Sequence, residues 1–162
     1  MTFRSTWLRN CAYRIFYRLP LRMRCHLVRR LTTNYTVGAV AVVRDQHQRV
    51  LLVRQPRNHG WSLPGGLAER GEAPPQTAAR ELYEEVGISM SPEELKPGYP
   101  SARVNPRSQQ VDMIFTVTVE SDVELRTDPA EIVRAEWHAP DRLPRLTGPT
   151  DQLLRLCGVI DD

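Results

Sequence analysis

Hydrophobic residues follow two different periods along the chain, and the shorter period predicts strands. Residues 37–43 (VGAVAVV) and 50–53 (VLLV) are apolar runs rich in β-branched residues, separated by the polar stretch 44–48, and together they predict a β-hairpin. Residues 111–119 (VDMIFTVTV) form the longest strand candidate, and residues 132–138 predict another strand. These runs indicate a sheet assembled from segments that are far apart in the sequence.

Two shorter segments extend this pattern. Residues 61–63 (WSL) stand between His59-Gly60 and Pro64-Gly65-Gly66, which predicts a short strand entering a tight glycine turn. Residues 123–126 are expected to continue the sheet after the longest strand.

The helical period of apolar residues predicts two helices among and after these strands, one in the middle of the chain and one near its C-terminus. Residues 78–86 are helical in pattern, preceded by the Pro74-Pro75 pair and followed by Gly87, a typical helix start and stop. Residues 150–156 predict a C-terminal helix. The resulting order, β-β-β-α-β-β-α, predicts an α+β fold in which helices pack on a sheet.

The N-terminal segment has a helical pattern and an unusual charge. Residues 7–19 and 21–31 predict two short helices separated by Pro20. Nine arginines and no acidic residue occur between Met1 and Arg44, whereas the remainder holds 13 basic and 19 acidic residues. We therefore expect a basic amphipathic arm over residues 1–34 and a domain over residues 35–162. Three roles stay open for the arm: packing on the domain, resting on an anionic membrane, or contacting an RNA backbone.

The overall composition is that of an ordinary soluble domain. The chain has 162 residues, of which 41% are hydrophobic and 25% charged, which excludes a disordered or fibrous protein. It contains no apolar run near the roughly 18 residues that a membrane span requires. Its three cysteines are far apart and form no CxxC pair, which argues against a disulfide framework or a zinc site and favours a cytoplasmic location.

The densest chemistry lies on the predicted central helix. Glu81, Glu84 and Glu85 stand at positions i, i+3 and i+4, so their carboxylates share one helix face with Cβ atoms about 5 to 6 Å apart. Such a cluster is either fully solvated or neutralised by cations, and oxygen donors of this kind suit Mg²⁺ or Mn²⁺.

The residues around this cluster complete a longer motif. The pattern Gly66-x5-Glu72-x7-Arg80-Glu81-Leu82-x-Glu84-Glu85-x-Gly87-Ile88 resembles the Nudix box, GX5EX7REUXEEXGU, at every defined position. The resemblance to the Nudix hydrolase family implies an α/β/α sandwich around a mixed sheet. It also implies a hydrolase that cleaves the diphosphate linkage of a nucleoside diphosphate joined to another moiety.

The resemblance also implies roles for individual residues. Glu81, Glu84 and Glu85 would supply carboxylates to Mg²⁺, or alternatively Mn²⁺, with the Gly65 carbonyl as a further donor. Arg80 and Glu72 would orient these carboxylates, because a guanidinium fixes carboxylate rotamers through forked hydrogen bonds.

A second candidate lies outside the box, where family members often carry a catalytic glutamate on a loop before a strand with a tryptophan. Glu131 stands six residues before Trp137 and matches this arrangement, although Asp128 and Glu136 compete with it. The base that deprotonates the attacking water is therefore Glu131 or Glu81.

The substrate is less well specified than the reaction. Arg54, Arg57 and Trp61, with His59 between them, precede the glycine turn and are candidates for contacting phosphate or a base. A nucleoside triphosphate or a nucleotide sugar is the expected substrate. An RNA 5′-end pyrophosphohydrolase and a non-catalytic nucleotide-binding module are the alternatives, and the sequence leaves open whether the chain forms a homodimer.

Overall fold

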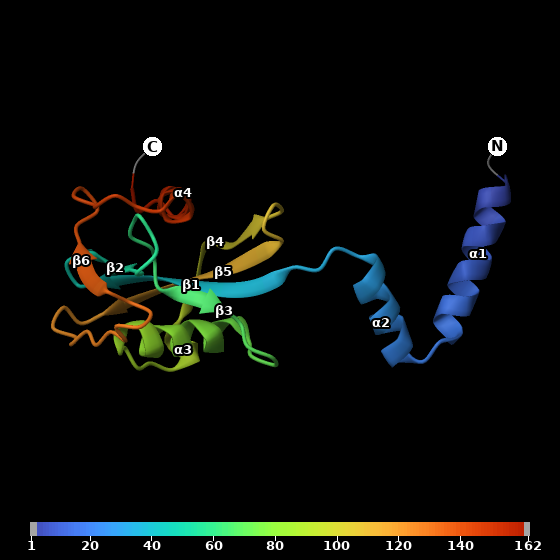
Figure 1. Ribbon diagram of the computed structural model, residues 1–162, viewed down its shortest axis with the longest axis horizontal. Coiled ribbons are helices and arrows are strands. Elements are labelled where there is room, and N and C mark those ends of the chain that lie inside the picture. Colours follow the sequence, from blue (N-terminus) through green and yellow to red (C-terminus); the bar gives the residue numbers. More distant parts are fainter. Residues whose placement is uncertain (1–2, 161–162) are drawn as a thin grey trace. The chain divides into compact units, whose positions relative to one another are not determined.

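A computed structural model describes the backbone of residues 3–160 and the side chains of residues 10–160 (Figure 1). The chain forms two compact units, one ending at Tyr35 and the other beginning at Thr36. The first unit holds the predicted helices, α1 (Phe3–Arg18) and α2 (Leu21–Leu31), which meet at Pro20. Within the described residues no helix is both long and apolar enough to cross a bilayer.

The second unit is a mixed sheet with helices on both faces. Its elements are β1 (Thr36–Asp45), β2 (Val50–Arg54), β3 (Gly65–Leu67), α3 (Pro74–Val86), a 3₁₀ turn (Pro92–Glu94), β4 (Lys96–Asn105), β5 (Gln110–Val119), β6 (Arg134–His138) and α4 (Gly148–Leu156). The strand order is β4-β5-β1-β2-β6, with β3 paired to β1 outside this path. β1 runs parallel to β5 and antiparallel to β2 and β3, so the sheet is mixed, as expected.

Alternating residues of the central strands build a core on each face of the sheet. Ala41 and Val43 of β1 point to one side and pack in a cluster with Leu82 of α3. Val42 points to the other side and packs in a cluster with Leu154 of α4. Side chains alternate between the two faces along a strand, and here both faces are covered. β1 and β2 are therefore apolar at nearly every position rather than at every second one. The result is the predicted α/β/α sandwich, with α3 and α4 on opposite faces (Figure 1).

The helix α3 begins and ends where its sequence signals predict. Its first turn contains Pro74 and Pro75, and the Gln76 side chain accepts a hydrogen bond from the Ala73 N–H at 2.9 Å. Gly87 ends the helix with φ 75°, a left-handed conformation that glycine adopts without a Cβ penalty.

Several strand predictions need correction. β4 was absent from the expected elements, because Pro97, Gly98 and Pro100 give its sequence the signature of a loop. The ladder between β4 and β5 is indeed irregular between Pro97 and Ala102. Residues 123–126 are not a strand, and residues 61–62 form only isolated bridges, whereas the glycines expected in a turn belong to β3. All three cysteines are free, and the cytoplasmic location inferred from them stays a prediction.

The turn between β1 and β2 is held by Asp45, whose side chain is fully buried. Its Oδ1 accepts hydrogen bonds from the N–H groups of His47 (2.9 Å) and Arg49 (2.8 Å), and its Oδ2 accepts one from Arg49 Nε at 2.6 Å. Burial alone would raise the pKa of Asp45, but the bonds and charge of Arg49 together with the His47 N–H hold this pKa below its ordinary value.

We expect Asp45→Ala to lower the free energy of unfolding by about 1–3 kcal/mol at pH 7, because it leaves buried donors unpaired. An acid with a lowered pKa in the folded state stabilises the fold above its unfolded pKa, and this contribution is lost as the pH falls through the folded value. Urea unfolding of parent and variant at neutral and acidic pH measures this, and the difference between them should shrink below about pH 4. A difference that grows at low pH would contradict this role.

Candidate functional site

The site is built on β3, whose two glycines bring the backbone against α3. Gly65 has φ +149°, and a Cβ there would lie 2.2 Å from the Ala39 carbonyl oxygen of β1. A Cβ on Gly66 would lie 2.2 Å from Glu81 Oε1. Only glycine therefore allows β3 to pair with β1 on one side and to receive the Glu81 carboxylate on the other.

Glu85 is the most buried carboxylate of the site, with 4% of its surface exposed. Its Oε2 accepts a hydrogen bond from the Gly65 N–H at 2.9 Å. Burial raises the pKa of Glu85 to about 7 despite the Gly65 bond, and the negative charges of Glu81 and Glu131 add to the rise. In the described part of the chain, the hydrogen-bond partner of this carboxylate is therefore a neutral backbone N–H and not a cation.

Glu81 shares this environment but also touches a cation. Its side chain is 13% exposed, and Oε1 lies 2.9 Å from Arg80 Nη1. Burial raises the pKa of Glu81, opposed by Arg80 and assisted by the charges of Glu84 and Glu131. Glu81 and Glu85 therefore repel each other in a partly desolvated space, and the charge of the exposed Glu131 adds to this repulsion.

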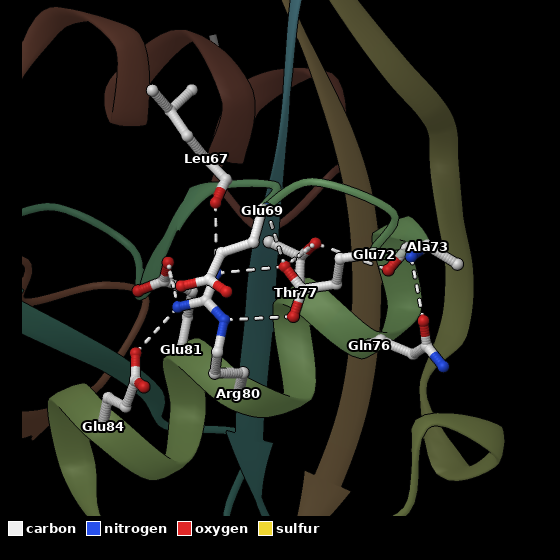
Figure 2. Close-up of polar contacts among 9 residues, drawn as sticks. All are labelled: Leu67, Glu69, Glu72, Ala73, Gln76, Thr77, Arg80, Glu81 and Glu84. Carbon is white, nitrogen blue, oxygen red and sulfur yellow. Dashed lines mark hydrogen bonds and ion pairs between the residues drawn. The ribbon is translucent and has the colours of Figure 1, made fainter.

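Arg80 connects the loop after β3 to the helix (Figure 2). Its Nε and Nη2 donate to the two carboxylate oxygens of Glu72 at 3.0 and 3.2 Å. Nη1 donates to Glu84 at 2.7 Å and Nη2 also donates to the Leu67 carbonyl at 3.1 Å. The Arg80 hydrogen bond, followed by the Glu69 N–H, lowers the pKa of Glu72 to about 2, so this carboxylate stays ionised. Arg80 thus links Glu72, Glu84 and the Leu67 carbonyl in one network, and the orienting role expected of Arg80 and Glu72 stays a prediction.

The three carboxylates of α3 have different surroundings. Glu81 and Glu85 face β3, while the Glu84 side chain is 50% exposed and turns toward Arg80. Among the described residues no three His, Cys, Asp or Glu side chains form a ready-made metal site. The donors that do gather are all oxygen atoms and carry uncompensated negative charge, which fits a hard divalent cation such as Mg²⁺ or Mn²⁺.

The three acidic candidates outside the box lie in different surroundings. Glu131 is exposed on the turn before β6, and its charge acts on both Glu81 and Glu85. Asp128 instead accepts a hydrogen bond from the Ala130 N–H at 2.9 Å within the same turn. Glu136 forms an ion pair with Arg134 at 3.7 Å and lies 3.7 Å from Nε2 of His138, whose pKa is lowered by burial. Glu131 is therefore the candidate best placed to work with the box.

A cleft of about 240 Å³ adjoins β3 on the side of the sheet that carries α4. Gly65 and Gly66 form part of its wall, and the same two glycines contact the Glu85 and Glu81 carboxylates of α3. Arg103 of β4 and Asp112 of β5 also line it, with side chains 17% and 13% exposed. The Gln110 side chain donates to Asp112 at 2.6 Å.

The residues expected to contact substrate lie outside the lining of this cleft. Arg54 and Arg57 are exposed, and Trp61 packs edge-on against His138 with ring centroids 5.0 Å apart. The cleft is lined instead by residues that the sequence did not single out, among them Gln55, Asn58, Arg103 and Asp112, and the substrate contacts expected of Arg54, Arg57 and Trp61 stay a prediction. The one available signal was Asp112, an acidic residue inside the apolar run of residues 111–119.

We expect Arg80→Lys to lower the free energy of unfolding by about 1–3 kcal/mol, because lysine cannot donate to Glu72, Glu84 and Leu67 at once. Urea unfolding measures this loss. Arg70→Lys on the exposed part of the same loop is the matched control and should unfold like the parent. Equal stabilities of all three proteins would show that the contacts of Arg80 with Glu72, Glu84 and Leu67 contribute nothing to the free energy of unfolding.

Comparison with known proteins agrees with this geometry. The family model described as "NUDIX domain" matches residues 34–157. The "Putative 8-oxo-dGTP diphosphatase" of Bacillus subtilis (strain 168) is 30% identical over 119 residues, which cover 71% of this chain and 74% of that protein. The NAD-capped RNA hydrolase NudC of Edwardsiella ictaluri is 33% identical over 109 residues, covering 66% of this chain and 40% of that protein.

A solved structure supports the same assignment. The MutT NUDIX hydrolase from Burkholderia pseudomallei aligns with a TM-score of 0.64 and 25% identity, over 76% of this chain and 98% of that one. The family model covers both the glycine strand and the carboxylate helix described above. This chain is accordingly a member of the Nudix family and a hydrolase of phosphoanhydride bonds.

Proposed function

We propose that this enzyme hydrolyses the diphosphate linkage of a small nucleotide, either a nucleoside triphosphate or a nucleotide sugar. The observation that carries the proposal is the buried Glu85 carboxylate, held by the Gly65 N–H beside Glu81 and Glu131. Like charges in a desolvated space are costly unless a cation joins them. Such a cation would in turn attract the negative phosphates of a substrate.

Nudix hydrolases generally use divalent metal ions. In this chain Glu81, Glu84 and Glu85, with the Gly65 carbonyl, would hold Mg²⁺ or Mn²⁺. A bound ion of this kind neutralises charge on phosphate oxygens and lowers the pKa of a coordinated water.

The remaining residues of the box position these donors. Arg80 holds the Glu81 and Glu84 carboxylates, and Glu72 holds Arg80 from the opposite side. The Leu67 carbonyl ties the same guanidinium to β3. Because Glu72 touches Arg80 and not the expected reaction centre, its role is positioning.

Proton transfer is assigned to Glu131, with Glu81 as the alternative. Glu131 is exposed and lies within electrostatic reach of the buried Glu85 and the partly buried Glu81. An ionised carboxylate in this place accepts the proton that water releases as it attacks phosphorus. The leaving phosphate departs with the oxygen that bridged the two phosphates.

The cleft beside Gly65 and Gly66 is the proposed place for the nucleoside. Its wall includes Gly65 and Gly66, which contact the Glu85 and Glu81 carboxylates of α3, so a nucleoside bound there would have its phosphates directed toward those carboxylates. Arg103 and Asp112 offer a donor and an acceptor in the cleft. The name of the Bacillus subtilis relative supports the nucleoside triphosphate class.

A substrate panel tests this proposal. Nucleoside triphosphates, nucleotide sugars, dinucleotides and 5′-capped or triphosphorylated RNA are incubated with Mg²⁺ or Mn²⁺, and the products are identified. We expect a nucleoside monophosphate with pyrophosphate or a sugar phosphate. Turnover of RNA ends alone would transfer the assignment to the RNA 5′-end alternative, and binding without turnover would favour a non-catalytic module.

The cleft assignment makes a separate prediction. Arg103→Gln removes a positive charge from the cleft and leaves Glu81, Glu84 and Glu85 in place. We therefore expect about a tenfold higher KM with a smaller change in kcat. Arg107→Gln, at the exposed tip of the β4–β5 hairpin, is the matched control and should leave both constants unchanged. If the two variants behave alike, the nucleoside binds elsewhere.

A further inference from the structure

The helix α2 carries an apolar surface that finds no cover within its own unit. None of its residues is buried, although half of them are hydrophobic. At about 100° per residue the hydrophobic side chains fall on one side of the helix. Five of these are between 39% and 75% exposed: Leu21, Met23, Leu27, Val28 and Leu31.

The opposite side of α2 is basic. Arg22, His26, Arg29 and Arg30 follow one another around this side and are all exposed. Arg24 lies on the apolar side, but its guanidinium sits 5.7 Å from the Tyr17 ring centroid of α1 and so faces the neighbouring helix. The helix therefore separates an apolar face from a cationic one.

The charge of the whole unit sets the class of partner. The first 35 residues contain eight arginines and no aspartate or glutamate. Such a segment repels cationic surfaces and is attracted to anionic ones, with a strength that salt reduces.

The apolar face then distinguishes between anionic partners. An RNA backbone would engage the arginines and leave five exposed hydrophobic side chains without a partner. A bilayer interface accepts both faces, since acyl chains take the apolar side while headgroups take the cationic side. A groove between α1 and α2, lined by Phe16, Leu21 and Val28 among others, continues the apolar face with a volume of about 390 Å³.

We propose that α2 lies along the surface of an anionic lipid bilayer and holds the Nudix domain there. With 11 residues it is about 16 Å long, roughly half of a bilayer's hydrocarbon thickness, so it would lie in the interface. The apolar face would enter the outer acyl region and the arginines would contact lipid phosphates. This inference does not depend on the identity of the substrate.

Vesicle binding by the full chain tests the inference. The parent protein is sedimented with vesicles of phosphatidylcholine alone and with vesicles of equal parts phosphatidylcholine and phosphatidylglycerol. We expect binding to the anionic vesicles only, weakened by added salt. A double variant, Leu27→Glu with Leu31→Glu, should bind at least about tenfold more weakly, because glutamate keeps helix propensity but removes apolar area and adds negative charge.

Two controls keep the result interpretable. Leu156→Glu changes a leucine that is 50% exposed on α4 and should bind vesicles like the parent. Nucleotide turnover of the double variant in solution should equal that of the parent, which shows that the domain is folded. The inference is overturned if the parent ignores anionic vesicles, binds neutral ones equally, or is unaffected by the double substitution. Binding of a single-stranded RNA in place of vesicles, unchanged in the double variant, would overturn it in favour of a nucleic-acid role.

Discussion

Replacing Glu85 by glutamine should lower kcat by about 10³-fold, the largest effect expected from a single substitution in this enzyme. Glutamine keeps the size of the side chain and an oxygen that can accept the Gly65 N–H bond. It removes the negative charge on which cation binding depends. Mn²⁺ binding, measured by calorimetry, should weaken in parallel with kcat.

The same substitution is expected to leave stability unchanged or to increase it. The pKa of Glu85 is raised to about 7, so the folded state binds a proton there more tightly than the unfolded chain does. Ionised Glu85 therefore costs stability progressively as the pH rises from the ordinary glutamate pKa through 7. At pH 8 in EDTA, Glu85→Gln should unfold at an equal or higher urea concentration than the parent.

Glu124→Gln provides the control for both measurements. Glu124 is exposed and paired with Arg126, outside the candidate site, and its loss should change neither kcat nor Mn²⁺ affinity. Equal rates for Glu85→Gln and the parent would remove the metal assignment. A large loss of stability in Glu85→Gln would instead show that the buried charge is structural.

The second large effect is expected from Gly66→Ala. A Cβ at this position would lie 2.2 Å from Glu81 Oε1, so the carboxylate has to move. The moving group is the tip of a flexible side chain, and Gly66 does not have a positive φ. We therefore expect kcat to fall by about 10²-fold, the cost of displacing a reacting group by about 1 Å, with little change in the free energy of unfolding.

Gly148→Ala is the matched control for this substitution. Gly148 lies at the first residue of α4, and a Cβ there meets nothing within 4 Å. It should retain parental turnover and stability. If Gly66→Ala and Gly148→Ala turn over substrate equally well, the contact between Glu81 and β3 has no part in catalysis.

The sheet and its helices were largely predictable, and the exceptions share one cause. Apolar runs located β1, β2 and β5, and the prolines and glycine around α3 located its ends, because these signals are local. β4 was missed because Pro97, Gly98 and Pro100 are typical of a loop. These residues form a strand only because they pair with β5, and that pairing is not visible in the local sequence. Residues 123–126 have a strand-like composition but no strand to pair with.

The sequence alone determined which residues we propose to carry the chemistry. The spacing of Glu81, Glu84 and Glu85 is a property of the helix itself, and the glycines and Arg80 belong to the same short motif. Tertiary structure decided how three similar carboxylates differ. Glu85 is buried against Gly65, Glu81 lies on Gly66 and Glu84 turns to Arg80, because packing on β3 desolvates one helix face unevenly. Tertiary structure also brought Glu131 to the box and placed Arg103 and Asp112 in the cleft, since their elements meet only in the folded sheet.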